Sequence, residues 1–172
     1  MTDTTPTESN LSGLDRKDFQ KNINSRKTDL YILKNAQGME VAVTNYGCAI
    51  LSIMVPDKNG KFANVILGHD SIEHVINSPE PFLSTTIGRY GNRIANGKFT
   101  LYGEEHQLTV NNGPNSLHGG PTGFHARVWD AVQPNESTVI FNYTSADGEE
   151  GFPGTLEIEM TYRLEDEANA WL

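Results

Sequence analysis

The residues whose types and spacing could do chemistry lie in two polar, glycine-rich stretches. The first, residues 86–97, places Arg89, Asn92 and Arg93 between glycines. Glycine lets the backbone approach a ligand closely. Arginine is a permanently charged fork of donors that suits a carboxylate or several sugar oxygens. The spacing also fits a structural loop with exposed arginines, so both interpretations stay open here. A dinucleotide loop is excluded, because the glycines do not follow GxGxxG and no βαβ pattern surrounds them.

The second stretch, residues 111–125, centres on His118. Two glycines follow this histidine, and Asn115 and Ser116 precede it. An imidazole on such a tightly shaped loop can act near neutral pH as an acid, a base or a hydrogen-bond partner. A surface histidine without a function is the alternative on local features alone.

Other reactive side chains give weaker signals. His106, His118 and His125 match no common zinc spacing, which argues against a metal site. Cys48 lies at the edge of an apolar stretch with no histidine nearby in sequence, which favours a small buried residue over a nucleophile. The acidic cluster at residues 147–150 is expected to form a solvated turn, at most at the rim of a site.

Short β-strands are the elements that must position these loops. Residues 156–164 alternate between apolar and polar side chains, which is typical of a strand with one buried and one wet face. Three Asn-Gly pairs supply the positive φ angles that tight hairpin turns need. Strands are expected at residues 29–34, 39–43, 49–55, 62–67, 98–102, 107–110, 139–143 and 156–164. Only residues 71–76 have a helical pattern, so the sequence predicts an all-β sandwich or barrel.

Composition excludes several classes of protein. The 172 residues carry a formal net charge of −9, which argues against a nucleic-acid partner and a polybasic membrane anchor. A single cysteine excludes an internal disulfide scaffold. The sequence contains neither a long apolar run nor a secretory signal pattern, so we expect a soluble, cytoplasmic protein.

Two segments are expected along the chain. Residues 1–27 are polar and are expected to form a mobile tail with a docking segment around Phe19. Residues 28–172 form the β domain. Residues 165–169 resemble a turn, and residues 170–172 start what looks like a return strand. This pattern favours the front part of a longer protein over a short natural tail.

Taken together, several motifs resemble the aldose 1-epimerase (galactose mutarotase) family. The matching segments, in order along the chain, are residues 45–47 (NYG), 65–68 (VILG), 86–94 (TIGRYGNRI), 115–120 (NSLHGG) and 147–154 (DGEEGFPG). His125 stands where the family more often has an aspartate. Each motif alone is weak, but their common order makes the resemblance specific.

The resemblance implies a β-supersandwich fold, no cofactor and a small sugar as the partner. It implies that Asn92, Arg93 and His118 contact the substrate, and that His118 belongs to the catalytic group. The family's second histidine, its aspartate and its catalytic glutamate have no match in residues 1–172. The expected activity is therefore interconversion of the α and β anomers of aldohexoses such as galactose and glucose, with this chain alone inactive or severely impaired.

Two other functions stay open on sequence grounds. A non-catalytic carbohydrate-binding β-sandwich would use similar polar loops. An epimerase-like protein acting on a phosphorylated sugar would need a cationic pocket, which a chain at −9 with no evident basic cluster makes less favourable.

Overall fold

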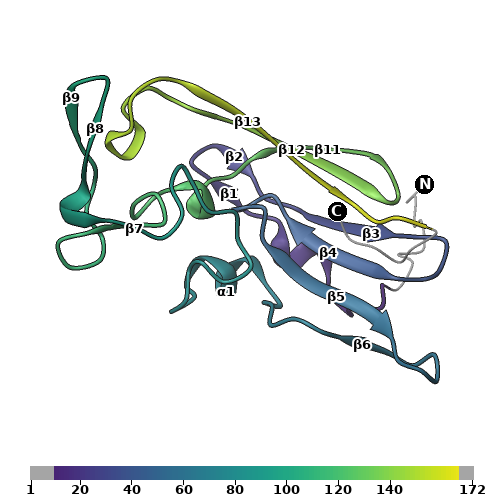
Figure 1. Cartoon of the computed structure of the whole chain (residues 1–172). Coiled ribbons are helices and arrows are strands. Elements are labelled where there is room, and N and C mark those ends of the chain that lie inside the picture. The colour runs from purple at the N-terminus through teal and green to yellow at the C-terminus, as the bar shows by residue number, and fades with distance from the viewer. Residues whose placement is uncertain (1–9, 167–172) are drawn as a thin grey trace.

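The computed structural model describes residues 10–166, which form two stacked antiparallel sheets with smaller hairpins around them (Figure 1). The larger sheet has four strands in the order β3–β4–β5–β6. They are β3 (Leu30–Lys34), β4 (Glu40–Thr44), β5 (Ile50–Pro56) and β6 (Phe62–Asn64). Every residue of β4 is buried, because other parts of the chain cover both faces of the sheet at this strand.

The smaller sheet has three strands in the order β11–β12–β13. They are β11 (Asp130–Asn135), β12 (Thr138–Ser145) and β13 (Leu156–Arg163). The last two pair without a register shift along their whole length. The backbone N–H of Leu164 continues this ladder by donating to the carbonyl of Ser137 over 2.9 Å.

The main hydrophobic core lies between these two sheets. Trp129 and Phe141 are fully buried there, and each meets neighbouring aromatic rings edge-on. The core residues are Leu33, Met39, Val41, Val43, Cys48, Phe124, Trp129, Val139, Phe141 and Leu164. This arrangement confirms the predicted all-β sandwich, with the apolar faces of both sheets turned toward each other.

Asn45 ties distant segments of the chain together. Its side-chain Nδ2 donates to the carbonyls of Lys27 and Trp129, and its Oδ1 accepts from the N–H of Asp29. The backbone N–H of Trp129 in turn donates to the carbonyl of Asn45 over 2.8 Å. One amide side chain therefore joins the start of the larger sheet to the segment that leads into the smaller one.

The outer face of the larger sheet is covered by short elements from two regions. A 3₁₀ helix (Arg16–Phe19), a small hairpin of β1 (Asn22–Ile23) and β2 (Arg26–Lys27), and α1 (Ile72–Ile76) lie here. Phe19 is fully buried in a second core cluster with residues of β3, β5 and α1. Residues 10–27 thus pack against the sheet through this phenylalanine.

Glu40 is the one charged side chain in the described core that is fully buried. Its carboxylate accepts hydrogen bonds from the backbone N–H groups of Leu11 and Ser12 at 2.9 and 3.0 Å. The Lys34 ammonium lies 3.9 Å away. These contacts satisfy the buried carboxylate and fasten the N-terminal segment to β4.

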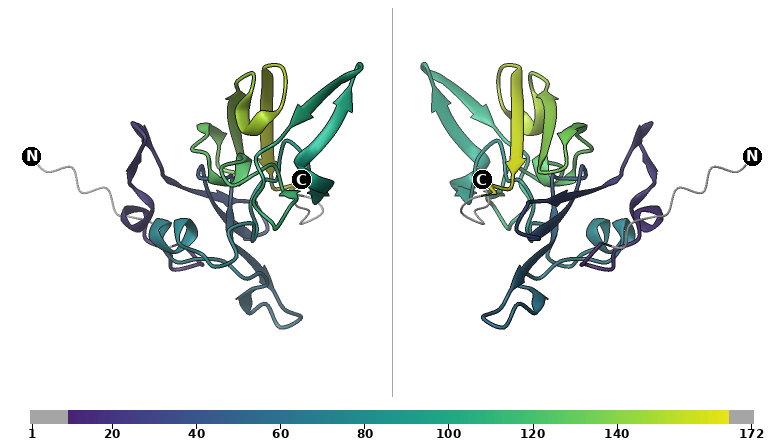
Figure 2. Two further views of the ribbon diagram at one scale, coloured as in Figure 1. Left: turned by 90° about the vertical axis from the view of Figure 1, so that its left-hand side faces the viewer. Right: turned by 90° about the vertical axis from the view of Figure 1, so that its right-hand side faces the viewer.

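The polar loops project from one end of the sandwich. They contain β7 (Arg93–Ile94), β10 (Ser116–Leu117), and a hairpin of β8 (Lys98–Leu101) and β9 (Glu104–Gln107). Short 3₁₀ turns occur at Ala95–Gly97, Phe124–Ala126 and Glu149–Gly151. The β8–β9 hairpin projects outward beside the smaller sheet (Figure 2).

Several expected strands differ in their bounds. The β8–β9 reversal is at Tyr102–Gly103, both with positive φ as a tight two-residue hairpin turn requires, so the returning strand starts earlier than expected. The pattern of residues 62–67 predicts a longer strand than β6. β11 was missed, because its polar residues and Pro134 hide the period of two. The expected return strand at residues 170–172 lies outside the described residues.

Candidate functional site

The structure brings the two glycine-rich loops together as a short ladder between β7 and β10. Leu117 lies opposite Arg93 in this ladder. The side chain of Asn111 braces it by accepting from the N–H of Leu117 and donating to its carbonyl. The backbone N–H of His118 then donates to the carbonyl of Asn92 over 2.9 Å. Residues widely separated in sequence therefore share one surface.

His118 is held in a defined orientation by Asn92. The backbone N–H of Asn92 donates to Nδ1 of His118 over 2.9 Å, so Nδ1 acts as an acceptor. A neutral imidazole with Nδ1 as acceptor carries its proton on Nε2. His118 is half-buried, with φ of +53°, and Asn92 is exposed, with φ of +63°. The pair therefore presents Nε2–H as a fixed hydrogen-bond donor.

Arg93 is exposed and only partly engaged. Its Nε donates to Oδ1 of Asn112 over 2.9 Å, and Nη1 donates to Oδ1 of Asn92 over 3.3 Å. Its Nη2 donates to none of the residues that the structure describes. Because Asn92 contacts both Arg93 and His118, it connects the two predicted substrate-contacting side chains. This places a cationic fork with a spare donor beside the imidazole donor.

Arg89 has a different role from Arg93, although both lie in the same loop. Its guanidinium donates to Oγ of Ser145 and to the backbone carbonyls of Ser145, Ala146, Pro153 and Gly154. All five N–H groups of the fork can be satisfied by these acceptors. Arg89 is therefore a structural residue that fastens the loop to the turn between β12 and β13.

An aromatic ring separates His118 from a second histidine. The Phe82 ring centroid lies 4.8 Å from that of His118 and 4.6 Å from that of His125. His125 is 4 % exposed, and its Nδ1 has no hydrogen-bond partner among the described residues. Burial is the main factor that lowers the pKa of His125 to about 4, and the nearby Glu150 carboxylate opposes this shift. His125 is therefore neutral at physiological pH, and its ring packs against Phe82.

The acidic cluster at residues 147–150 is more enclosed than the sequence suggests. Glu150 accepts from both the backbone N–H and the hydroxyl of Thr122. Glu149 accepts from the hydroxyl of Tyr143 over 2.5 Å and lies 3.7 Å from the Arg127 guanidinium. Burial and the bond to Glu149 raise the pKa of Tyr143 to about 12. The expected solvated turn describes Asp147 and Gly148, which are exposed, whereas Glu149 and Glu150 are half-buried and hold neighbouring loops in place.

The remaining candidates lie away from this surface. Cys48 is fully buried in the core, and burial raises the pKa of its thiol. His106 lies on β9 and stacks on Phe99 with ring centroids 5.1 Å apart. Within residues 10–166, no group of three or more His, Cys, Asp or Glu side chains could hold a metal ion.

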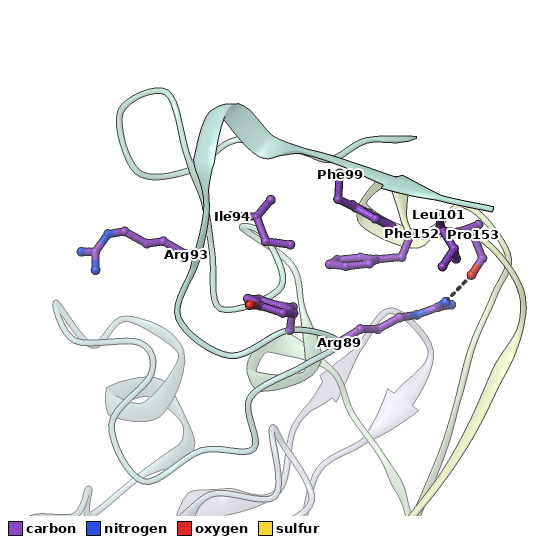
Figure 3. Close-up of a pocket in the computed structure, with 8 residues that line it drawn as sticks. Arg89, Arg93, Ile94, Phe99, Leu101, Phe152 and Pro153 are labelled. Carbon is purple, nitrogen blue, oxygen red and sulfur yellow. Dashed lines mark hydrogen bonds between the residues drawn. The ribbon is translucent and has the colours of Figure 1, made fainter. Parts of the chain in front are cut away.

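Asn92, Arg93 and His118 form what we call the polar site. A cavity of about 480 Å³ opens next to it (Figure 3). The apolar side chains of Ile94, Phe99 and Phe152 line it. The Arg89 side chain extends toward Pro153, whereas the Arg93 side chain points away from the other labelled side chains (Figure 3). Arg93 also lines this cavity, whereas Asn92 and His118 do not, so the mainly apolar cavity adjoins the polar site at Arg93.

Several residues of this site were missed by the sequence reasoning. Asn111 and Asn112 brace the loops, and Phe82 lies against His118. The two asparagines lie in a stretch that the sequence analysis singled out for its polarity, but nothing in it distinguishes bracing from solvation. Phe82 gives no local signal, because its role depends on a contact with a residue far along the chain.

The fold places the chain in a known class of β-sandwich. A GalM/aldose epimerase homologue from Caenorhabditis elegans superposes with a TM-score of 0.75 and 32% identity, over 80% of this chain and 42% of the other. Galactose 1-epimerase from Lactobacillus acidophilus superposes with a TM-score of 0.74 and 30% identity, over 86% and 43% respectively. The fold is therefore that of the galactose mutarotases.

The family follows from the sequence match. The family model for aldose 1-epimerase matches residues 29–171, and the chain belongs to this family. Galactose mutarotase from Bos taurus is 41% identical over 127 residues, which cover 74% of this chain and 36% of the relative. Aldose 1-epimerase from Escherichia coli K12 is 41% identical over 138 residues, 80% of this chain and 40% of the relative. The chain thus spans about two fifths of these relatives and matches their N-terminal part. No helix within residues 10–166 has the length and apolar character needed to cross a membrane.

Proposed function

We propose that this chain supplies the substrate-contacting loops of an aldose 1-epimerase that interconverts the α and β anomers of aldohexoses such as galactose and glucose. The observation that carries the proposal is the Asn92–His118 pair, which fixes Nε2–H of His118 as a donor beside the spare Nη2 of Arg93. A neutral donor and a cationic fork suit the uncharged, oxygen-rich surface of a sugar.

The chemistry of anomer exchange assigns a role to these donors. A base removes the proton of the anomeric hydroxyl while an acid donates a proton to the ring oxygen, so the ring opens to the aldehyde. Rotation about the bond to the carbonyl carbon and closure in the reverse sense then give the other anomer. His118 hydrogen-bonds the ring oxygen side of the sugar, and Arg93 orients its hydroxyls.

The complete acid–base pair is not assembled from the described residues. Glu149 accepts a hydrogen bond from Tyr143, and Glu150 accepts one from Thr122, so both carboxylates are already engaged. We therefore assign the catalytic base to a segment equivalent to the part of the relatives that lies beyond the matched region. We assign the acid, a second histidine, to the same segment. Each positioned acid or base typically contributes about 10²–10⁴-fold to the rate, so this chain alone is expected to be nearly inactive.

Polarimetry of freshly dissolved α-galactose or α-glucose tests this proposal. Residues 1–172 would be assayed alone and as a single-chain fusion to the unmatched C-terminal part of the Escherichia coli enzyme. The fusion is expected to accelerate the change in rotation, and residues 1–172 alone are not. In the fusion, His118→Ala should lower the rate by about 10²-fold or more, whereas His74→Ala on exposed α1 should not. Strong activity of residues 1–172 alone, or an unaffected His118→Ala fusion, would overturn the proposal.

A further inference from the structure

The three Asn-Gly pairs of the chain have different surroundings in the structure. Gly60 is exposed, but its N–H donates to the carbonyl of Asp57 over 2.9 Å, and Gly97 is buried. Gly113 is exposed, and its N–H donates to no residue that the structure describes. An asparagine side chain cyclises most readily onto the nitrogen of a following glycine, because no side chain shields that nitrogen. Asn112–Gly113 is therefore the pair whose backbone nitrogen is accessible for this reaction.

The turn that contains this pair has room for the reaction. The N–H of Asn112 donates to the carbonyl of Asn115 over 3.1 Å, and the N–H of Asn115 donates back over 3.0 Å. Gly113 and Pro114 form the exposed tip between them, with φ of +57° at Gly113. Apart from the chain neighbours of Gly113, no described residue comes within 4 Å of the place where its Cβ would lie. The backbone nitrogen at the tip is therefore sterically open.

Arg93 contacts the amide group that would react. Its Nε donates to Oδ1 of Asn112 over 2.9 Å. A cationic donor on a carbonyl oxygen makes the carbonyl carbon more electrophilic and stabilises the negative charge that develops on the oxygen during attack. The side-chain oxygens of Asn59 and Asn96 accept no hydrogen bond from a described lysine or arginine. The contact with Arg93 thus distinguishes Asn112 from the other two pairs.

We propose that Asn112 is a site of spontaneous deamidation that Arg93 promotes, and that the carboxylate formed there then occupies Arg93. The nitrogen of Gly113 attacks Cγ of Asn112, so a C–N bond forms and the bond from Cγ to Nδ2 breaks. The proton of the Gly113 nitrogen leaves with Nδ2 as ammonia, and a cyclic succinimide remains. Water then opens one of the two imide C–N bonds and yields aspartate or isoaspartate.

The product changes the hydrogen bonding of Arg93. Deamidation to aspartate replaces Nδ2, a donor, with a second carboxylate oxygen, which is an acceptor. Nε and Nη2 of a guanidinium form a parallel pair of donors that matches a carboxylate. Arg16 shows this arrangement in the same chain, because its Nε and Nη2 donate to the two oxygens of Asp29 at 2.7 and 2.5 Å. The new carboxylate therefore takes the spare Nη2 of Arg93, which the proposed function assigns to the sugar.

Mass spectrometry of aged protein tests the modification. Residues 1–172 would be incubated at mildly alkaline pH and digested, and the peptides that contain each Asn-Gly pair would be followed over time. Asn112 is expected to deamidate about tenfold faster than Asn59 or Asn96. Arg93→Met, which keeps a long side chain without donors, should slow Asn112 by about fivefold or more. Asn59 in the same sample is the internal control and should be unaffected.

A second variant tests the role of the backbone nitrogen. Gly113→Ala shields this nitrogen with a methyl group, for which the turn has space, and should slow deamidation of Asn112 by about tenfold. This variant also decides the outcome if Arg93→Met fails to fold. Equal rates at Asn112 and Asn59, or a rate at Asn112 that neither variant lowers, would overturn the proposal.

Asn112→Asp tests the capture of Arg93, since it introduces the product carboxylate directly. In an NMR titration of this variant, the new carboxyl should have a pKa below the ordinary aspartate value of about 3.9, because the guanidinium favours its charged form. Adding Arg93→Met should return the pKa toward that value. A carboxyl that titrates at the ordinary value in both proteins would overturn the capture of Arg93.

The consequence for sugar binding rests on the proposed function, and the single-chain fusion separates the two. In polarimetry, Asn112→Asp should lower kcat/KM of the fusion by about tenfold, whereas Asn59→Asp should change it by less than about twofold. An active fusion that Asn112→Asp leaves unchanged would overturn this consequence and leave the proposed function standing. An inactive parent fusion would refute the proposed function, while mass spectrometry and the titration would still decide the modification.

Discussion

His118 and His125 share one aromatic neighbour but have different settings. His118 is half-buried and hydrogen-bonded at Nδ1, whereas His125 is buried and its Nδ1 lacks a partner among the described residues. Burial, together with the nearby Arg127 and His118, lowers the pKa of His125, and Glu150 only partly opposes this effect. Because the folded chain disfavours the protonated form of His125, the free energy of unfolding should depend on pH.

The free energy of unfolding is expected to decrease as the pH falls from 6.5 to about 4, because the unfolded chain protonates His125 before the folded chain does. The loss attributable to this residue is on the order of 3 kcal/mol. Urea titrations at pH 7 and pH 4.5 would measure it, with His125→Asn as the variant that cannot titrate. Equal decreases in the parent and the variant would contradict this prediction.

The same substitution should affect stability strongly at one arginine of the first loop and weakly at the other. Arg89→Lys loses most of the fork that binds four carbonyls and Ser145, and should lower the free energy of unfolding by about 2 kcal/mol. Arg93→Lys should change it by less than about 0.5 kcal/mol, because Arg93 is exposed. Chemical denaturation of both variants checks this, and a larger loss for Arg93→Lys would reverse our assignment of their roles.

At the scale of elements, β4 shows how a buried strand can hold a distant segment. Its Glu40 carboxylate accepts from the N–H groups of Leu11 and Ser12. The amide of Glu40→Gln turns one acceptor into a donor that faces an N–H group. We expect a loss of about 1–3 kcal/mol in the free energy of unfolding.

Limited proteolysis before Phe19 would test whether the loss comes from release of the N-terminal segment. Cleavage there should become faster in Glu40→Gln than in the parent. Glu136→Gln is the control, since that side chain is exposed and bonds to no described residue. Equal cleavage rates in all three proteins would exclude the role given to Glu40.

The sequence predicts elements well where a periodic pattern and a turn signal coincide. The hairpin of β3 and β4 and the long β13 follow from alternation bounded by turn residues. β11 was missed because its exposed polar residues lack a period of two. For the site, residue types singled out Arg93 and His118, but the contacts made by Phe82 and the engagement of Arg89 depend on segments that only the fold brings together.

At the scale of the molecule, several large apolar side chains are exposed on the described surface. Tyr102 is 98% exposed, and Val65, Leu67 and Val132 are each more than half exposed. Large exposed apolar areas on isolated domains favour association. The open edge of β13 acts in the same direction.

Residues 1–172 alone are therefore expected to self-associate and to bind a hydrophobic dye. Sedimentation velocity should show a weight-average mass that rises with concentration, and Val65→Thr with Leu67→Ser should reduce the rise. A monomer that melts cooperatively and leaves the dye unbound would contradict this prediction.

The Asn45 amide has a consequence for the order of folding. Strands that pair within each sheet follow one another along the chain, so their hairpins can form on timescales of about 1–10 μs. The hydrogen bond from Asn45 to the carbonyl of Trp129 instead spans 84 residues. Closing such a long loop loses chain entropy before the contacts that compensate for this loss have formed. We therefore expect the two sheets to form before they dock. Asn45→Ala should accelerate unfolding while leaving the refolding rate nearly unchanged, which stopped-flow measurements can resolve.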